Sequence, residues 1–293
     1  MPSLFTSSHE PSKEEEAMTT IGRDSNETGV NFASREVAER WSQRQAHRDK
    51  VYGPATEMML DLADLRTGNR VLDVAAGTGD QTLLAARRVG PNGYVLATDL
   101  SASMLNIAAD VARKAGLTNI ETRVMDAQSL DFDADSFDAV ICRLGLMLFS
   151  NPSKALRETH RVLKRGGKVA GLVFSTAEKN AYQGIPLAVV RRLGSMPPPL
   201  FALGEPSMLE DAFRAAGFPG VAVHAVSVQR RFPSSAEVIR SLKDAVFLRE
   251  PMAKLRDAER EQAWVEIEQQ LRHFETLNGF EAPGEVLIGV ATK

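Results

Sequence analysis

Between residues 70 and 174 the chain alternates regularly between short apolar runs and amphipathic stretches. The apolar runs predict buried strands, and the spacing of the stretches between them predicts helices. The predicted strands are 70–75, 94–99, 120–125, 137–143 and 168–174, and the predicted helices are 81–89, 102–115 (capped by Ser101) and 153–163. Because apolar strands alternate with helices, the pattern predicts an α/β fold of parallel βαβ units, with helices on both faces of the sheet.

The pattern is less regular on either side of this region. Residues 31–66 predict an N-terminal helical cap, broken at Gly53-Pro54, and the polar residues 1–30 predict a flexible tail. Residues 67–178 form the predicted core, and residues 179–293 add elements of the same domain that cover the active edge of the sheet. In this last part we expect helices over 182–193, 207–216, 236–247 and 253–274, and strands over 221–228 and 285–291.

The composition limits the function classes. The chain has 293 residues, of which 43% are hydrophobic, and its formal net charge of −3 disfavours a nucleic-acid partner. We expect no membrane span, because no apolar run reaches about 18 residues. The N-terminus lacks the pattern of a secretory signal, so we expect a cytoplasmic protein. The only cysteine, Cys142, lies in an apolar run and is expected in the core, and we expect no metal site.

Residues 71–80, VLDVAAGTGD, carry the main chemical signal. A buried strand enters a Gly-x-Gly turn, and a helix begins directly afterwards with Asp80 as its expected N-cap. Gly77 and Gly79 allow the backbone to turn tightly and a ligand to approach closely. This turn is expected at the carboxyl edge of the first strand, where open α/β sheets bind ligands.

Two ligand classes compete for such a turn. A dinucleotide fingerprint would have a third glycine, but Thr82 occupies that position. The carboxylate of Asp73 would also repel a diphosphate, whereas it suits a ligand that carries an ammonium and a sulfonium group. The motif therefore favours S-adenosylmethionine over a nicotinamide dinucleotide.

Two further acidic residues end the next two predicted strands. Asp99 follows Gly79 by 20 residues, the spacing of a carboxylate that accepts hydrogen bonds from ribose hydroxyls. Asp126 ends the third strand, where its carboxylate can receive the amino group of adenine and the backbone of Ala127 can face the ring. With Asp73, these residues predict one binding site along the edge of the sheet.

Residues 70–176 resemble the class I methyltransferases, particularly the type 11 and UbiE/COQ5-like group. The resemblance rests on VLDVAAGTGD, on Asp99, on Asp126-Ala127 and on RVLKRGGKVA before the fifth strand. It implies a Rossmann-like, mostly parallel sheet of seven strands, the last of them antiparallel. It also implies an enzyme that uses S-adenosyl-L-methionine as cofactor and releases S-adenosyl-L-homocysteine.

The resemblance further implies roles for individual residues. Gly77 and Gly79 would line the methionine moiety, and Ala75 stands where many relatives have the first glycine of the loop. The other residues of the expected cofactor site are Leu100 and Met104 beside the adenine and the backbone near Arg143 beside the amino group of the donor.

The exit of the fourth strand, RLGLMLF, suggests an apolar acceptor pocket. The candidate pocket residues are Tyr52, Leu146, Met147, Phe149 and Tyr182. The sequence identifies no catalytic residue; His47, near Tyr52, is a weak candidate base, and His160, His224 and His273 rank below it. We therefore expect methyl transfer to a small apolar or aromatic molecule. A non-catalytic S-adenosylmethionine-binding module and a nucleotide-dependent oxidoreductase remain the alternatives, and the acceptor, the methylated atom and the oligomeric state stay open.

Overall fold

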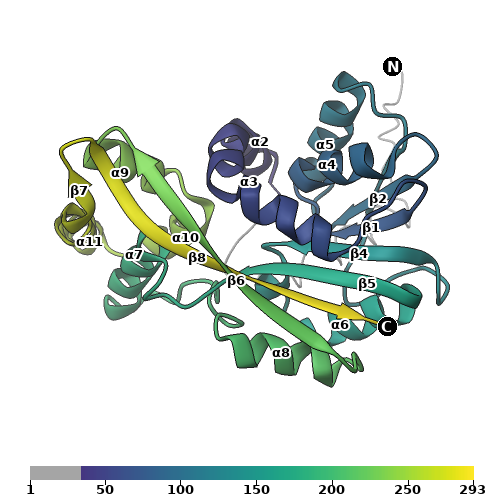
Figure 1. Cartoon of the computed structure of the whole chain (residues 1–293). Coiled ribbons are helices and arrows are strands. Elements are labelled where there is room, and N and C mark those ends of the chain that lie inside the picture. The colour runs from purple at the N-terminus through teal and green to yellow at the C-terminus, as the bar shows by residue number, and fades with distance from the viewer. Residues whose placement is uncertain (1–33) are drawn as a thin grey trace, which may run out of the picture.

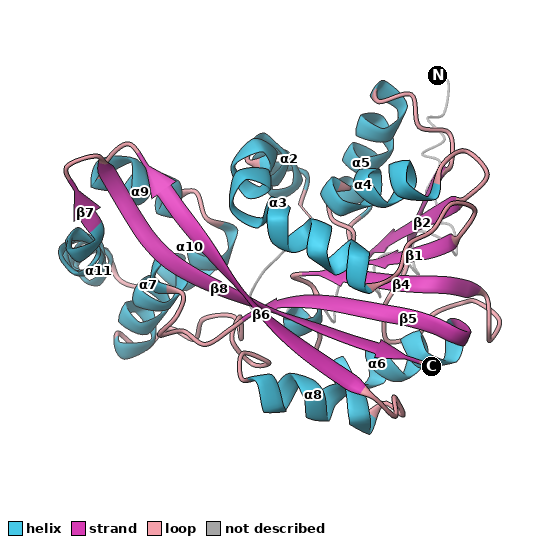
Figure 2. Ribbon diagram, viewed as in Figure 1, coloured by secondary structure: helices cyan, strands magenta, loops and turns pink. Residues whose placement is uncertain are grey.

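The computed structural model describes residues 34–293 and is built around an eight-stranded sheet (Figures 1 and 2). Its strands are β1 (Arg70–Val74), β2 (Tyr94–Asp99), β3 (Ile120–Val124), β4 (Phe137–Arg143), β5 (Leu163–Phe174), β6 (Val221–Phe232), β7 (Glu275–Thr276) and β8 (Gly279–Thr292). The strand order is β3-β2-β1-β4-β5-β8-β6, and β7 pairs with β8 outside this path.

The pairing confirms the predicted Rossmann-like sheet. Strands β1 to β5 are parallel, and the last strand, β8, is antiparallel to both β5 and β6. The predicted count of seven strands is wrong by one, because the two-residue strand β7 pairs with the start of β8. The central strands are buried on both faces, with Val71, Ile141 and Leu172 wholly inaccessible, which explains their continuous apolar sequences.

Helices cover the sheet on both sides. They are α2 (Arg35–Gln43), α3 (Gln45–Leu62), α4 (Asp80–Val89), α5 (Ala102–Lys114), α6 (Pro152–Val162), α7 (Ala181–Arg192), α8 (Pro206–Ala215), α9 (Ser235–Lys243), α10 (Val246–Ala253) and α11 (Asp257–Leu271). In Figure 1, α7, α9, α10 and α11 gather around one end of β6 and β8, and α6 and α8 lie near the other end. The predicted cap of α5 is confirmed, since the Ser101 hydroxyl accepts a hydrogen bond from the backbone N–H of Met104.

Two expectations about helix boundaries are wrong. The chain does not break at Gly53-Pro54, since α3 runs through Pro54 and the break lies at Arg44. The cost of a proline inside the helix is offset by a buried face that includes Ala55 and Met59. Asp80 is the first residue of α4 and not its cap. Gly79 takes the cap position with φ of 86°, a conformation that favours glycine.

The C-terminal strands are longer than predicted. β6 continues to Phe232 and β8 begins at Gly279, and the two pair antiparallel from Val221–Ala291 to Phe232–Phe280. The polar residues of this extension have no apolar pattern of their own, so only the pairing reveals the strand. The long helix predicted over 253–274 is also wrong, because α10 ends at Ala253 and α11 begins at Asp257. The predicted tail lies outside the described residues, and the division into cap and core stays a prediction.

Candidate active site

Asp99 lies at the centre of the edge formed by β1, β2 and β3. Its Oδ2 accepts a hydrogen bond of 2.9 Å from the N–H of Gly77, and its Oδ1 accepts one of 2.9 Å from the N–H of Ser101. Burial raises the pKa of Asp99, although these backbone N–H groups act in the opposite direction. A carboxylate has about four lone-pair positions, so Asp99 can also accept hydroxyl groups of a ligand.

The loop after β1 is held in a tight, left-handed path. Ala75, Gly77 and Gly79 have φ of 55°, 57° and 86°. The alanine in place of the first glycine therefore takes a strained conformation, of the kind that concentrates at functional sites. The loop also approaches the exit of β4 closely, because a Cβ on Gly145 would lie 2.5 Å from the Cβ of Ala75.

Asp73 holds the start of α4. Its carboxylate accepts hydrogen bonds from Thr82 Oγ1 at 2.6 Å and from Gln81 Nε2 at 3.0 Å, and the side chain is fully buried. Burial raises the pKa of Asp73 to about 7. Thr82, which replaces the third glycine of a dinucleotide motif, is thus a partner of Asp73. The expected contact between Asp73 and an ammonium group stays a prediction, since both oxygens already have partners in the protein.

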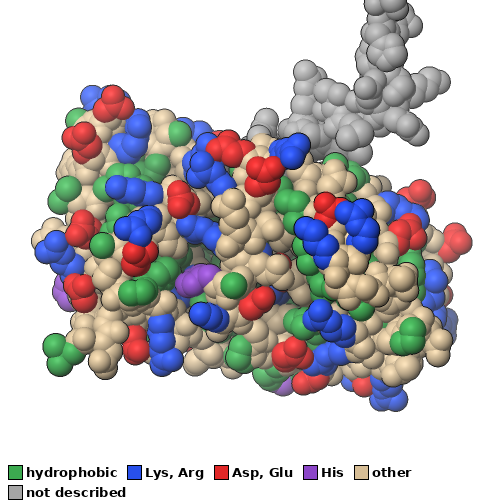
Figure 3. Space-filling view, turned by 90° about the horizontal axis from the view of Figure 1, so that it is seen from above, with side chains coloured by type: hydrophobic (Ala, Val, Ile, Leu, Met, Phe, Trp, Pro, Cys, Tyr) green, Lys and Arg blue, Asp and Glu red, His purple; other side chains and the backbone are tan. Residues whose placement is uncertain are grey.

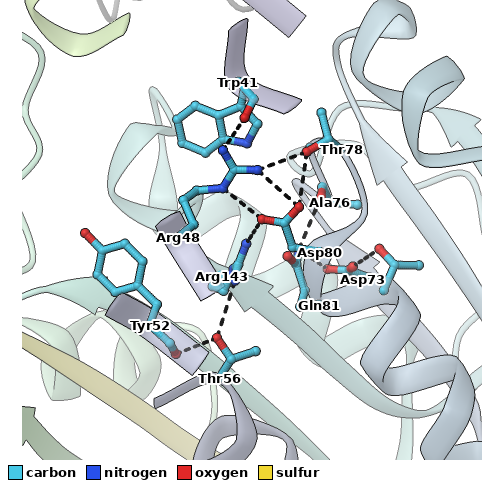
Figure 4. A network of polar contacts seen from close by, with 12 residues as sticks. Trp41, Arg48, Tyr52, Thr56, Asp73, Ala76, Thr78, Asp80, Gln81 and Arg143 are labelled. Atoms are coloured by element: carbon cyan, nitrogen blue, oxygen red, sulfur yellow. Dashed lines mark hydrogen bonds and ion pairs between the residues drawn. The ribbon is translucent and has the colours of Figure 1, made fainter. Parts of the chain in front are cut away.

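Asp80 joins two buried arginines beside the glycine loop (Figure 4). Arg48 donates from Nε at 2.8 Å and from Nη2 at 3.1 Å, and Arg143 donates from Nη2 at 2.7 Å. The Arg48 guanidinium also lies 4.4 Å from the ring centroid of Trp41, whose indole nitrogen is the nearest neighbour of the Cβ position at Gly77. This cluster carries two positive charges against one negative charge.

The remaining predicted cofactor residues lie along the same edge. Leu100, next to Asp99, is 40% exposed, whereas Met104 is buried against Val37 and Ala38 of α2. Asp126 accepts a hydrogen bond of 2.8 Å from the N–H of Gln128 and so shapes the turn after β3. Ala127, which follows it, is buried.

The candidate pocket residues have different contacts within one core. Leu146 and Met147 are buried in the main core, and Phe149 packs against that core. Tyr52 and Tyr182 belong to the same core and also meet around Arg230, which donates a hydrogen bond to the Tyr52 hydroxyl and lies 4.2 Å from the centroid of the Tyr182 ring. All five candidate residues thus lie in or against one core, and their role in an acceptor pocket stays a prediction.

His47, the candidate base, also faces Arg230. Its Nε2 lies 3.3 Å from Nη1 of Arg230, and its ring packs at 4.9 Å from the ring of Phe232. Burial, together with the charge of Arg230, lowers the pKa of His47 to about 4. The imidazole is therefore neutral at pH 7.

Sequence reasoning missed Arg48, Trp41 and Arg230. One signal was present, because Arg48, Tyr52 and Thr56 follow one another at intervals of four and so share a face of α3. Arg230 gave no such signal. Within residues 34–293, no group of three or more His, Cys, Asp or Glu side chains is placed to bind a metal ion.

Two comparisons with known sequences find similarity to the same family of methyltransferases. Residues 54–197 match the model of the ubiE/COQ5 methyltransferase family. The chain is 37% identical over 142 residues to the ubiquinone/menaquinone biosynthesis C-methyltransferase UbiE of Pseudomonas aeruginosa, a match that covers 47% of this chain and 56% of the relative. The corresponding enzyme of Pseudomonas savastanoi is 43% identical over 117 residues, with 40% and 46% covered. The chain thus spans about half the length of these curated relatives.

Solved structures share the fold at lower identity. The YcgJ protein of Bacillus subtilis has a TM-score of 0.58 and 22% identity, and the match covers 82% of this chain and 99% of that one. The phosphoethanolamine N-methyltransferase 2 of Haemonchus contortus, solved with S-adenosylhomocysteine, has a TM-score of 0.57 and 17% identity, with 93% and 60% covered. No helix within residues 34–293 has the length and apolar character needed to cross a bilayer.

Proposed function

We propose that the chain is a class I methyltransferase of the UbiE/COQ5 type, whose family model matches residues 54–197, and that it transfers a methyl group from S-adenosylmethionine to a small apolar or aromatic molecule. The curated relatives are named for ubiquinone and menaquinone biosynthesis, but the family match ends at residue 197. The elements after that point lie outside the family match. We therefore propose the donor and the reaction from the family, and the acceptor from this chain's own residues.

One observation supports a sulfonium donor over a dinucleotide. A dinucleotide places its diphosphate on free N–H groups at the start of the helix after the glycine loop. Here the N–H of Gly77 donates to Asp99, and the carboxylate of Asp80 lies in the first turn of α4. A diphosphate would meet the carboxylate of Asp99 and would lose the N–H of Gly77 as a donor, so the loop suits a ligand without phosphate.

The residues along the sheet edge fit S-adenosylmethionine. Asp99 has lone pairs left for the ribose hydroxyls, and the exposed side chain of Leu100 offers an apolar surface for adenine. The surplus positive charge of Arg48 and Arg143 suits the carboxylate of the methionine moiety. When bound, this cofactor supplies an electrophilic methyl group on a positively charged sulfur.

The protein's own contribution is to position the acceptor and to exclude water. The aromatic residues Tyr52 and Tyr182 are both 3% exposed and would form part of the acceptor side. A base is needed only for a hydroxyl or carbon acid, and His47 stays the candidate for that role. On the face seen in Figure 3, acidic and basic side chains are interspersed, which favours a small-molecule acceptor over a polyanion.

Replacing Asp99 by alanine tests this proposal. A hydrogen bond to a charged group contributes about 1.5–3 kcal/mol, so we expect S-adenosylhomocysteine to bind at least about tenfold more weakly. Asp110→Ala is the matched control, since Asp110 lies on α5 in an exposed pair with Arg113. Isothermal titration calorimetry measures both variants. Wild-type affinity in Asp99→Ala would remove Asp99 from the cofactor site.

A further inference from the structure

Arg230 is a buried cation without an acidic partner. It lies near the end of β6, is 8% exposed, and belongs with Arg48 and Arg143 to the buried arginines of the described chain. Arg48 and Arg143 share the carboxylate of Asp80, whereas no Asp or Glu within residues 34–293 lies within ion-pair distance of Arg230. A guanidinium that has lost its water without gaining a counter-ion is costly to the fold. The free-energy cost of burying Arg230 indicates that this side chain has a role in function.

The hydrogen bonds of Arg230 leave capacity for a ligand. Its two bonds to described residues run to the hydroxyl of Tyr52 and to Nε2 of His47, and both partners are neutral. A guanidinium carries five N–H donors in a planar fork that matches two oxygens of one anion. Arg44 and Arg48, which lie nearby, pair with Asp244 and Asp80, so the guanidinium of Arg230 is the group that attracts an anion.

Aromatic rings surround this guanidinium. The rings of Tyr182 and Phe232 stack with centroids 5.8 Å apart and planes 9° apart, and Phe247 meets Tyr182 edge-on at 6.4 Å. The guanidinium lies 4.2 Å from the centroid of Tyr182 and 5.3 Å from that of Tyr52. These rings come from α3, α7, β6 and α10, so the cap elements after residue 178 complete the cluster. Flat aromatic surfaces around a cation favour a planar, aromatic ligand.

Helix α3 connects this cluster to the proposed donor site. Arg48, Tyr52 and Thr56 follow at intervals of four along one face of the helix. Arg48 binds Asp80, Tyr52 binds Arg230, and Thr56 accepts a hydrogen bond of 3.4 Å from Arg143. Figure 4 shows the Tyr52 ring extending away from the Asp80 cluster on the same helix. Neighbouring turns of α3 thus contact the residues that flank the proposed donor and the guanidinium of Arg230.

We propose that Arg230 binds an ionised oxygen, either a phenolate or a carboxylate, of an aromatic acceptor whose ring lies among Tyr52, Tyr182 and Phe232. This inference rests on the proposed function and adds a charge requirement to it: the acceptor is an aromatic anion, and Arg230 selects it over a neutral molecule of the same shape. Arg230 is a positioning residue for the acceptor, and the donor binds independently of it.

Matched pairs of small probes test the charge requirement. The wild-type protein, saturated with S-adenosylhomocysteine, is titrated with 4-nitrophenol and its neutral methyl ether 4-nitroanisole, and then with benzoate and benzamide. We expect one of the two anions to bind at least about tenfold more tightly than its neutral partner, which also distinguishes a phenolate from a carboxylate. Absorbance should also show a larger ionised fraction for bound 4-nitrophenol than for the free compound. Equal binding of anions and neutral partners would overturn the inference.

Two variants assign the effect to Arg230. Arg230→Met should lose the preference for the anion, while Arg231→Met should keep it, because Arg231 is exposed and pairs with Glu281. Since Arg230→Met removes an uncompensated buried charge, we expect its thermal midpoint to rise by about 2 °C or more. A preference that survives in Arg230→Met would overturn the inference. Should Arg230→Met not fold, Arg230→Lys replaces it, with a weakened but retained preference expected.

Titration of the wild-type protein with S-adenosylhomocysteine distinguishes a failure of the Arg230 inference from a failure of the proposed function. Wild-type protein that binds S-adenosylhomocysteine but shows no preference for the anion overturns only the role of Arg230. Wild-type protein that does not bind S-adenosylhomocysteine contradicts the proposed function itself.

Discussion

Replacing Asp80 by asparagine tests how the buried cluster beside the glycine loop is held together. The Asp80 side chain is 2% exposed, and those of Arg48 and Arg143 are 7% and 5% exposed. Asparagine has nearly the same shape but no negative charge. The variant would therefore leave two buried guanidinium groups without their shared carboxylate.

The size of the effect follows from the contacts. Three charge-assisted hydrogen bonds reach the Asp80 carboxylate from Arg48 and Arg143. They share one acceptor group and asparagine keeps one oxygen, so their contributions do not simply add. Removing one partner of a buried ion pair costs about 3–5 kcal/mol. We expect Asp80→Asn to lower the free energy of unfolding by about that amount at neutral pH.

Urea unfolding followed by circular dichroism measures this loss. Asp110→Asn, in the exposed pair with Arg113, is the control and should lose less than about 1 kcal/mol. A loss in Asp80→Asn no greater than in this control would refute the reasoning, because the cluster would then contribute nothing to holding α3 against α4.

The cluster around Asp80 should also affect how the free energy of unfolding depends on pH in the acid range. Burial alone would raise the pKa of Asp80, but the hydrogen bonds from Arg48 and the charge of Arg143 outweigh it and lower the pKa below the ordinary value of 3.8. The unfolded chain therefore binds the proton more readily than the folded one. The stabilisation is present above pH 3.8 and is lost as the pH falls through the folded-state pKa. Asp80→Asn should lack this part of the acid transition.

Two further substitutions probe the loop itself. The pKa of buried Asp73 is raised from 3.8 to about 7, so the folded state holds this proton more tightly than the unfolded state, and stability should fall as the pH rises across that window. Asp73→Asn should remove this dependence, measured by urea unfolding at about pH 5 and about pH 8; an unchanged slope would contradict the assignment. Gly145→Ala places a Cβ 2.5 Å from Ala75 Cβ and should cost about 1–3 kcal/mol, with weaker binding of S-adenosylhomocysteine. Gly53→Ala is the control, because a Cβ at Gly53 would have no neighbour within 4 Å. A similar loss of stability in Gly53→Ala would contradict the steric explanation.

Local pattern was enough to predict the central fold. Strands β1, β2 and β4 and the second half of β5 are largely apolar and buried, so their own sequences identify them, whereas the edge strand β3 is polar and partly exposed. The neighbouring positions of Asp99 and Gly77 could also be anticipated, because parallel strands bring their carboxyl ends to one edge. The glycine spacing then indicated where a ligand would approach.

Contacts between distant segments could not be predicted in this way. Arg230 follows the glutamine at position 229 in a polar stretch, QRR, that resembles a solvated loop, and only the pairing of β6 with β8 places its side chain inside. Its partner Tyr52 lies 178 positions earlier in the chain. Likewise Arg48 meets Asp80 across 32 positions, through the packing of α3 against the loop. Leu146 and Met147, after β4, are buried in the same core as Tyr52 and Tyr182, and their place in an acceptor pocket stays a prediction.

Native mass spectrometry tests the central claim most directly. The full chain is incubated with equal, saturating amounts of S-adenosylhomocysteine and NAD, and the mass of the bound species is recorded. The geometry around Gly77, Asp80 and Asp99 predicts one bound S-adenosylhomocysteine per chain and no bound NAD. A complex with NAD alone would contradict the account, because a diphosphate would then occupy the loop in which the N–H of Gly77 already donates to Asp99.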